Sequence, residues 1–235
     1  MSNSPLVSYV RRSPNHSGPR THKIDTVSIH CMAGNLSVET CGSLFADSSR
    51  EASSNYGIGS DGRIALYVDE ANRSWCTSSA SNDNRAVTIE VANIEGREPY
   101  RVSDAAYKSL IRLLADICKR NGIPRLLWRG DPSLIGQVDR QNMTVHRWFA
   151  AKSCPGNWLY AQHGQIASDV NKLLEDEDVE VRELEMKSED TGAIIKVDAV
   201  LVGDVNYVKA RDLEKIAPIK IGWDGTRPTF NLVYK

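Results

Sequence analysis

The strongest structural signal in the sequence is the run AVTIEVA at residues 86–92, where β-branched residues predict a strand. Ser103 is expected to cap a long amphipathic helix that runs to Arg120, and Gly122 and Pro124 follow it as stop signals. A second strand is predicted at residues 24–30, before a helix at residues 37–50. Strands and helices that alternate in this way indicate an α/β protein.

Several shorter elements are predicted around this framework. The segment 55–68 is typical of a hairpin whose turn uses Gly62, and residues 126–128 form a short strand. A last helix is expected at residues 160–174. Residues 1–23 and the polar segment 69–85 are expected to be irregular, because neither shows a clear period.

Charge divides the chain into three segments. Residues 1–174 hold 20 basic and 16 acidic side chains, residues 175–190 hold 2 and 9, and residues 191–235 hold 7 and 5. We therefore predict a main domain over 1–174, an acidic segment over 175–190 that is a solvated linker or a helix, and a small α+β C-terminal module over 191–235. The module is expected to contain four short strands and a helix at 209–216. Because it is small for an independent fold, it could lean on the main domain or pair with another copy in a homo-oligomer.

The whole-chain composition excludes some classes of function. A net charge of −1 argues against a nucleic-acid partner, and no stretch approaches the ~20 apolar residues of a membrane span, so no membrane insertion is expected. The first residues lack the pattern of a signal peptide. The odd number of cysteines, five, then indicates reduced thiols, of which one could be a metal ligand.

Two histidines and a cysteine form a candidate metal site. His30 ends a predicted strand, His146 lies in the segment TVHRW, and Cys154 follows in KSCPG. Two imidazoles and a thiolate are good zinc ligands, and they leave a fourth position for a water molecule, whose pKa zinc lowers. Spacing alone does not decide this, since a lone histidine is more often structural and a lone cysteine is more often a small buried hydrophobe.

The wider pattern resembles a known family. The segments IHCMAG at 29–34, SNYGIGSDG at 54–62 and VTIE at 87–90, followed by His146 and by KSCPG at 152–156, resemble the type 2 N-acetylmuramoyl-L-alanine amidases over residues 20–174. The resemblance implies the fold of the peptidoglycan-recognition proteins, with a central mixed β-sheet flanked by helices. It also implies one Zn²⁺ held by His30, His146 and Cys154, and hydrolysis of the amide between N-acetylmuramic acid and L-alanine in bacterial peptidoglycan.

The resemblance assigns two catalytic residues. Lys152 matches a lysine that stabilises the oxyanion, although it could instead be a surface cation. Glu90 matches an acid that serves as general base and then as general acid. Alternation places Thr88 and Glu90 on one face of their strand, and a glutamate that points to solvent from an edge strand would show the same pattern.

Two residues are expected to bind substrate. Asn55 is expected to line the cleft, and Trp75 begins a segment that aligns with a cleft wall, where it could stack on a sugar or pack under the loop. One branch of the family carries a catalytic tyrosine where this chain has Ser54, so we expect Tyr56 to pack rather than to catalyse. That departure favours the mechanism assisted by Glu90.

Three functions remain open at this point. The first is a phage or prophage endolysin, made in the host cytoplasm, released through a holin pore and active at the cell wall. Its C-terminal module would bind the wall or form oligomers. The second is a cytoplasmic amidase that recycles muropeptides, and the third is a peptidoglycan-binding protein without catalytic activity.

Overall fold

The computed structural model describes residues 2–175, 180–187, 194–202, 205–208, 219–223 and 228–232. The chain divides into two compact units, Met1–Leu174 and Glu175–Lys235. Each unit is described by itself.

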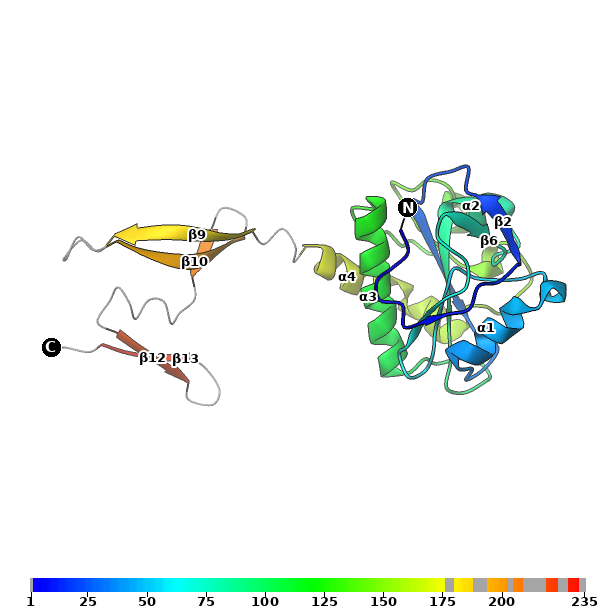
Figure 1. The fold of residues 1–235 in the computed structure, drawn as a ribbon, viewed down its shortest axis with the longest axis horizontal. Helices are drawn as coiled ribbons and strands as arrows, with labels where there is room; N and C mark the ends of the chain where they lie inside the picture. The colour runs from blue at the N-terminus through cyan, green and yellow to red at the C-terminus, as the bar shows by residue number, and fades with distance from the viewer. Residues whose placement is uncertain are drawn as a thin grey trace. The chain divides into compact units, whose positions relative to one another are not determined.

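The larger unit contains a six-stranded mixed sheet with the strand order β1-β5-β4-β7-β3-β8 (Figure 1). Its strands are β1 (Tyr9–Val10), β3 (Thr26–Cys31), β4 (Tyr56–Ile58), β5 (Ile64–Leu66), β7 (Ala86–Val91) and β8 (Met143–Thr144). Only β4 and β5 pair antiparallel within this sheet, and they form the predicted hairpin. A separate two-stranded sheet pairs β2 (His16–Pro19) with β6 (Asn72–Ser74).

Four α-helices and three short 3₁₀ helices complete the unit. They are α1 (Val38–Ala46), η1 (Ser48–Arg50), α2 (Ala80–Arg85), α3 (Asp104–Asn121), η2 (Pro132–Leu134), η3 (His146–Trp148) and α4 (Asn157–Glu175). The predicted signals set the ends of α3. Ser103 Oγ accepts a hydrogen bond from the Ala106 backbone N–H at 3.1 Å, and Gly122 ends the helix at a φ of +66°.

The two faces of the central sheet have different roles. Val27 and Ile29 of β3 and Val87 and Ile89 of β7 are fully buried in the main core, which α3 and α4 complete. The alternate residues of the same strands point to the opposite face, where α1 packs in a smaller cluster. Figure 1 shows α3 and α4 on one side of the sheet and α1 on the other. Any polar site on β3 and β7 therefore lies on the side of α1.

Three segments that were expected to be irregular or to form a short strand differ from that expectation in the structure. Residues 126–128 do not form a strand, because the Leu126 backbone N–H and carbonyl bond instead to the side chain of Asn171 in α4. The segment 1–23 contains β1 and β2, and the segment 69–85 contains β6 and α2. These strands are two to four residues long and find their partners far away in sequence, so no local period marks them.

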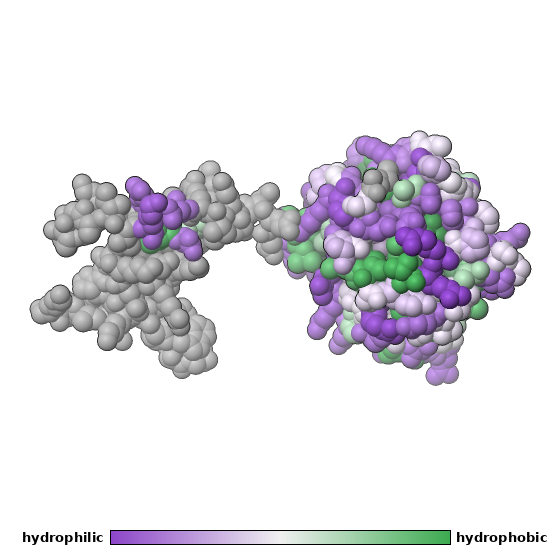
Figure 2. Space-filling model, viewed as in Figure 1, coloured by the Kyte–Doolittle hydropathy of each residue, from purple (hydrophilic) through white to green (hydrophobic). Residues whose placement is uncertain are grey.

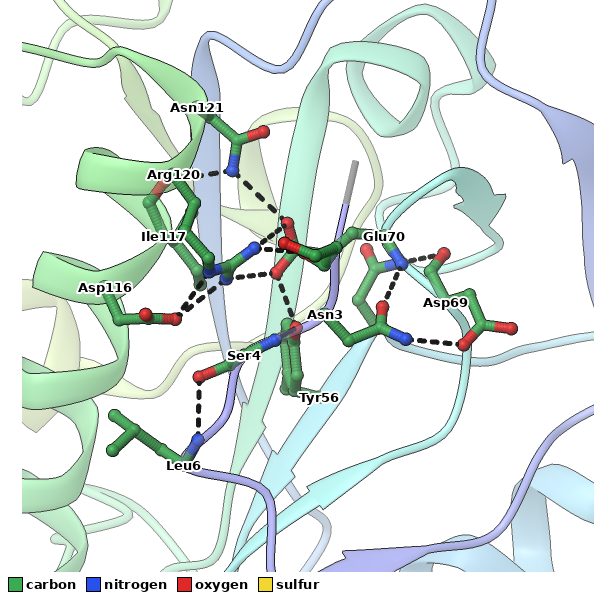
Figure 3. A network of polar contacts seen from close by, with 12 residues as sticks. Asn3, Ser4, Leu6, Tyr56, Asp69, Glu70, Asp116, Ile117, Arg120 and Asn121 are labelled. Carbon is green, nitrogen blue, oxygen red and sulfur yellow. Dashed lines mark hydrogen bonds and ion pairs between the residues drawn. The ribbon is translucent and has the colours of Figure 1, made fainter.

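A buried polar network fastens the N-terminal segment to the domain (Figure 3). At its centre Glu70 is fully buried, and the Arg120 guanidinium of α3 lies 2.6 Å from its carboxylate. Tyr56 donates its hydroxyl proton to the same carboxylate and accepts a hydrogen bond from the Ser4 backbone N–H at 2.9 Å. The side-chain oxygen of Asn3 accepts a hydrogen bond from the Glu70 backbone N–H at 2.9 Å. The network thus joins the N-terminal segment, β4 and α3.

The smaller unit contains a three-stranded antiparallel sheet and a two-stranded one. The strands are β9 (Glu180–Lys187), β10 (Ile194–Val202), β11 (Val205–Val208), β12 (Ile219–Trp223) and β13 (Pro228–Leu232). The four predicted strands are present, whereas the predicted helix at 209–216 lies outside the described residues.

The acidic segment 175–190 differs from both alternatives expected of it. Its described residues Glu180–Lys187 form strand β9, which pairs with β10, rather than a helix or a solvated linker. Charged and apolar residues alternate through ELEMK at 183–187, which is the period of a strand with one polar face. Glu183 accordingly is exposed and forms an ion pair of 2.6 Å with Lys196 of β10. The assignment of a catalytic domain to residues 1–174 and of a separate C-terminal module to residues 191–235 stays a prediction.

The surface of the larger unit is mixed in character. Figure 2 shows mostly hydrophilic residues on the visible face, with hydrophobic side chains gathered near its middle. In the described part of the chain, no helix combines the length and the apolar character needed to cross a bilayer.

Candidate functional site

His30 lies near the end of β3, and this strand positions its side chain in the site. Its side chain is fully buried, and its Nε2 lies 3.1 Å from the hydroxyl of Ser28, the preceding residue on the same face. That hydroxyl donates its only proton to the Thr144 carbonyl, so it accepts a proton from Nε2. His30 Nδ1 is then the unprotonated nitrogen, and it lies 3.3 Å from Cys154 Sγ. The strand therefore presents a ring whose free lone pair faces the thiol.

A short loop brings the other two predicted ligands to His30. His146 begins η3, and the backbone N–H of the next residue, Arg147, donates to the Cys154 carbonyl at 3.1 Å. Gly156 completes the turn at a φ of +82°, and a Cβ there would lie 2.8 Å from the Cβ of Tyr100. The rings of His30 and His146 have centroids 5.3 Å apart.

The three predicted ligands form a suitable donor set for zinc. One donor atom from each of His30, His146 and Cys154 lies within 4.8 Å of the others. Burial lowers the pKa of His30 to about 3, with a further contribution from His146, and burial also lowers the pKa of His146. Both rings are therefore neutral near pH 7, as a metal ligand requires. A hydrogen bond with Cys31 and burial raise the pKa of the Cys154 thiol, and a bound cation would oppose this by stabilising the thiolate.

Glu90 faces the same site. It is the direct register partner of His30, and its strand β7 lies between β3 and β4, so it is not on a sheet edge. Its Oε1 lies 4.0 Å from His30 Nδ1 and 4.0 Å from Cys76 Sγ. Its Oε2 is buried and has no hydrogen-bond partner among the residues that the structure describes. Burial, assisted by Cys31 and opposed by Arg50, raises the pKa of Glu90.

These groups open into a cleft of about 690 Å³. Glu90, His146, Cys154, Lys152 and Trp75 all line it. The loop that carries Cys76, Ser78 and Ser79 also lines the cleft, and so do residues of α1. The cleft thus holds four of the five predicted catalytic and metal residues, and the fifth, His30, lies buried behind them.

Lys152 belongs to the cleft but is exposed. Its charge adds to the effect of burial in lowering the pKa of His146, so the ammonium group acts on the same ligand cluster. Trp75 is 36% exposed at the cleft, and its indole Nε1 donates to Ser17 Oγ at 2.9 Å. Part of the indole surface is therefore open to a ligand, as stacking on a sugar would require.

Asn55 does not line the cleft. Its side chain is fully buried, where Nδ2 donates to the Val68 carbonyl at 3.2 Å and Oδ1 accepts from the Thr88 backbone N–H at 3.1 Å. The amide is fully used in joining β7 to the segment after β5, so the structure gives Asn55 a structural place instead of the expected substrate contact. Tyr56 packs as expected, because it is fully buried against Glu70.

The sequence did not single out Cys76. With His30 and Glu90 it forms a second group of donor atoms within 4.8 Å of one another. Its loop is held by Asp83, whose carboxylate accepts from the backbone N–H groups of Cys76 and Thr77. Nothing in the spacing of Cys76 marks it. The only signal was the segment that starts at Trp75, which aligned with a cleft wall.

Comparison with known proteins agrees with this geometry. The sequence profile of the N-acetylmuramoyl-L-alanine amidase family matches residues 20–157. No curated protein sequence matches the chain.

Solved structures share the fold at low sequence identity. The crystal structure of a selenomethionine derivative of AmpD is 17% identical with a TM-score of 0.52, over 70% of this chain and 96% of that one. The solution structure of the PlyG catalytic domain is 14% identical with a TM-score of 0.51, over 70% and 93%. A mutant endolysin from Bacillus subtilis is 12% identical with a TM-score of 0.51, over 70% and 99%.

Proposed function

The chain belongs to the N-acetylmuramoyl-L-alanine amidase family, and we propose that it is a zinc-dependent hydrolase of the amide between N-acetylmuramic acid and L-alanine in bacterial peptidoglycan. The observation that carries the proposal is the cluster of His30, His146 and Cys154 beside Glu90 in one cleft. A purely binding protein has no need of a buried carboxylate next to a set of metal donors.

His30, His146 and Cys154 would hold the zinc ion, and the cleft supplies room for water and substrate at the remaining position. Bound zinc would polarise the scissile carbonyl and lower the pKa of a water molecule. Ser28 fixes the tautomer of His30 through Nε2, so that Nδ1 keeps its lone pair.

Glu90 would act as the general base and then as the general acid of the reaction. Its Oε2 has no protein partner among the described residues, so it is available to take a proton from the attacking water and to return it to the leaving amine of L-alanine. Lys152, exposed at the same cleft, would stabilise the negative charge that develops on the carbonyl oxygen.

End-group analysis of digested cell wall tests this function. Incubation with purified peptidoglycan should release new N-terminal alanine and no new reducing sugar ends. New reducing ends would identify a glycosidase instead, and binding without any new end group would identify a recognition protein.

We further propose that the enzyme acts on the intact wall as a lytic enzyme of the phage or prophage endolysin type. The smaller unit supports this, because a recycling amidase for soluble muropeptides needs no second unit to reach its substrate. The unit could bind the wall or join copies of the chain. Turnover of insoluble sacculi should exceed that of soluble muropeptides at equal amide concentration. The reverse preference would favour a recycling enzyme.

A further inference from the structure

One side of the cleft differs in character from the rest. It is formed by α1 and by the segments before and after it, and its apolar residues include Leu36, Leu44 and Phe45. Leu44 is 43% exposed there, so its alkyl side chain is available for contact with a ligand in the cleft. The same cleft is also lined by Trp75 and the hydroxyl residues Ser78 and Ser79, which are better suited to a sugar.

Arg50 lies at the end of this apolar side and lines the cleft. Among the described residues, its guanidinium forms no ion pair and no side-chain hydrogen bond. The nearest acid before it in sequence, Asp47, is occupied by the backbone N–H and the hydroxyl of Ser49. The other cleft arginine, Arg73, differs because its guanidinium bonds to Ser17 Oγ.

The positive charge of Arg50 has an electrostatic effect on a group that lines the cleft. It opposes the rise that burial causes in the pKa of the Cys41 thiol, and Cys41 lines the same cleft. The guanidinium therefore acts on the same space that the substrate must occupy, beside an aliphatic wall. A peptide with small apolar side chains and a carboxylate is complementary to that combination, whereas a neutral sugar is not.

We propose that Arg50 is a specificity-determining residue that binds a free carboxylate of the stem peptide, on the leaving-amine side of the scissile bond. The apolar residues Leu36, Leu44 and Phe45 would contact the alkyl groups of that peptide. This inference rests on the proposed amidase function and adds to it a preference among peptidoglycans. Chains whose second stem residue carries a free α-carboxylate are better substrates than chains in which that group is a carboxamide.

The test uses two soluble muropeptides with identical tetrapeptide stems, one with a free α-carboxylate on the second residue and one with a carboxamide. The full chain should cleave the carboxylate form with a kcat/KM about tenfold higher, the size expected for one charge-assisted hydrogen bond. Arg50→Gln should reduce this ratio to about one by slowing the carboxylate substrate, and Arg50→Lys should keep part of it.

Glu51→Gln is the matched control, because Glu51 is the next residue and lines the same cleft. It should leave the preference for the carboxylate in place. Equal rates on both substrates in the wild type, or an unchanged ratio in Arg50→Gln, would overturn the inference while leaving the amidase function intact. Cleavage of neither substrate would instead contradict the proposed function.

Discussion

His30 and Glu90 are direct neighbours across two parallel strands, with Nδ1 and Oε1 4.0 Å apart. Parallel register sends partner residues to the same face of a sheet, so a proposed metal ligand and an acid share one side without any loop to position them. Val27, Ile29, Val87 and Ile89 anchor the opposite face in the core. Both side chains are therefore placed by two interior strands of the sheet whose other face is buried in the core.

Replacement of Glu90 by Gln should remove activity but not the metal. The amide has nearly the same shape as the carboxylate but cannot accept and return a proton, so kcat should fall by about 10²–10⁴-fold. Zinc content by elemental analysis should stay that of the wild type. Glu51→Gln, at an exposed acid of the same cleft, serves as the control. Full activity in Glu90→Gln would remove this residue from the mechanism.

Two cysteine variants distinguish the two possible donor sets, which share His30. If His30, His146 and Cys154 hold the metal, Cys154→Ser should lose zinc and Cys76→Ser should retain it. A chelator should lower the melting temperature of the wild type, and added zinc should restore it, because the metal binds only the folded state. Loss of zinc in Cys76→Ser but not in Cys154→Ser would assign the metal to the other group.

The buried pair of Glu70 and Arg120 should be important for stability. Their side chains are 1% and 18% exposed. Arg120→Met leaves the Glu70 charge buried without its partner, so unfolding in urea should become easier by about 3–5 kcal/mol. The exposed pair of Arg12 and Asp69 provides the comparison, since Arg12→Ala should cost less than about 1 kcal/mol. Similar costs for both variants would contradict the assigned role of burial.

Acidification should destabilise the fold through His163. Burial lowers the pKa of this ring to about 4, and its Nδ1 lies 2.7 Å from the Leu159 carbonyl. The unfolded chain takes up a proton near pH 6.5 and the folded chain does not, so stability falls as the pH drops from about 6.5 towards 4.

The check is urea unfolding at several pH values with chelator present, which leaves the contribution of His30 equal in both proteins. His163→Leu should show a loss of stability across this range that is smaller by up to about 3 kcal/mol. The same pH dependence in the variant and in the wild type would show that His163 is not responsible.

The sequence predicted the parts of the fold that have a local cause. The strand at residues 86–92 and the helix with Ser103 and Gly122 at its ends are set by alternation and by capping. The family resemblance supplied the three proposed ligands, which the fold brings together. The orientation of Glu90 was not predictable, because alternation cannot say which face of a strand looks at a site until its neighbours are known.

Other features depend on contacts between distant segments. Asn55 resembled a cleft residue by its place beside Tyr56, yet its amide is used by Val68 and Thr88. Cys76 entered the site because Asp83 holds its loop against β7. Strand β9 was not predicted, because its acidic composition indicated a linker or a helix, although its residues alternate as those of a strand do.

Hydrolysis in heavy-oxygen water tests the central claim most directly. A muropeptide cleaved by an amidase must receive the solvent oxygen on the lactyl carboxylate of N-acetylmuramic acid and release an unlabelled peptide with a free L-alanine amine. Mass spectrometry of the two products should show this pattern for the wild type and not for Glu90→Gln. Label on a sugar hydroxyl or on the peptide would contradict the account.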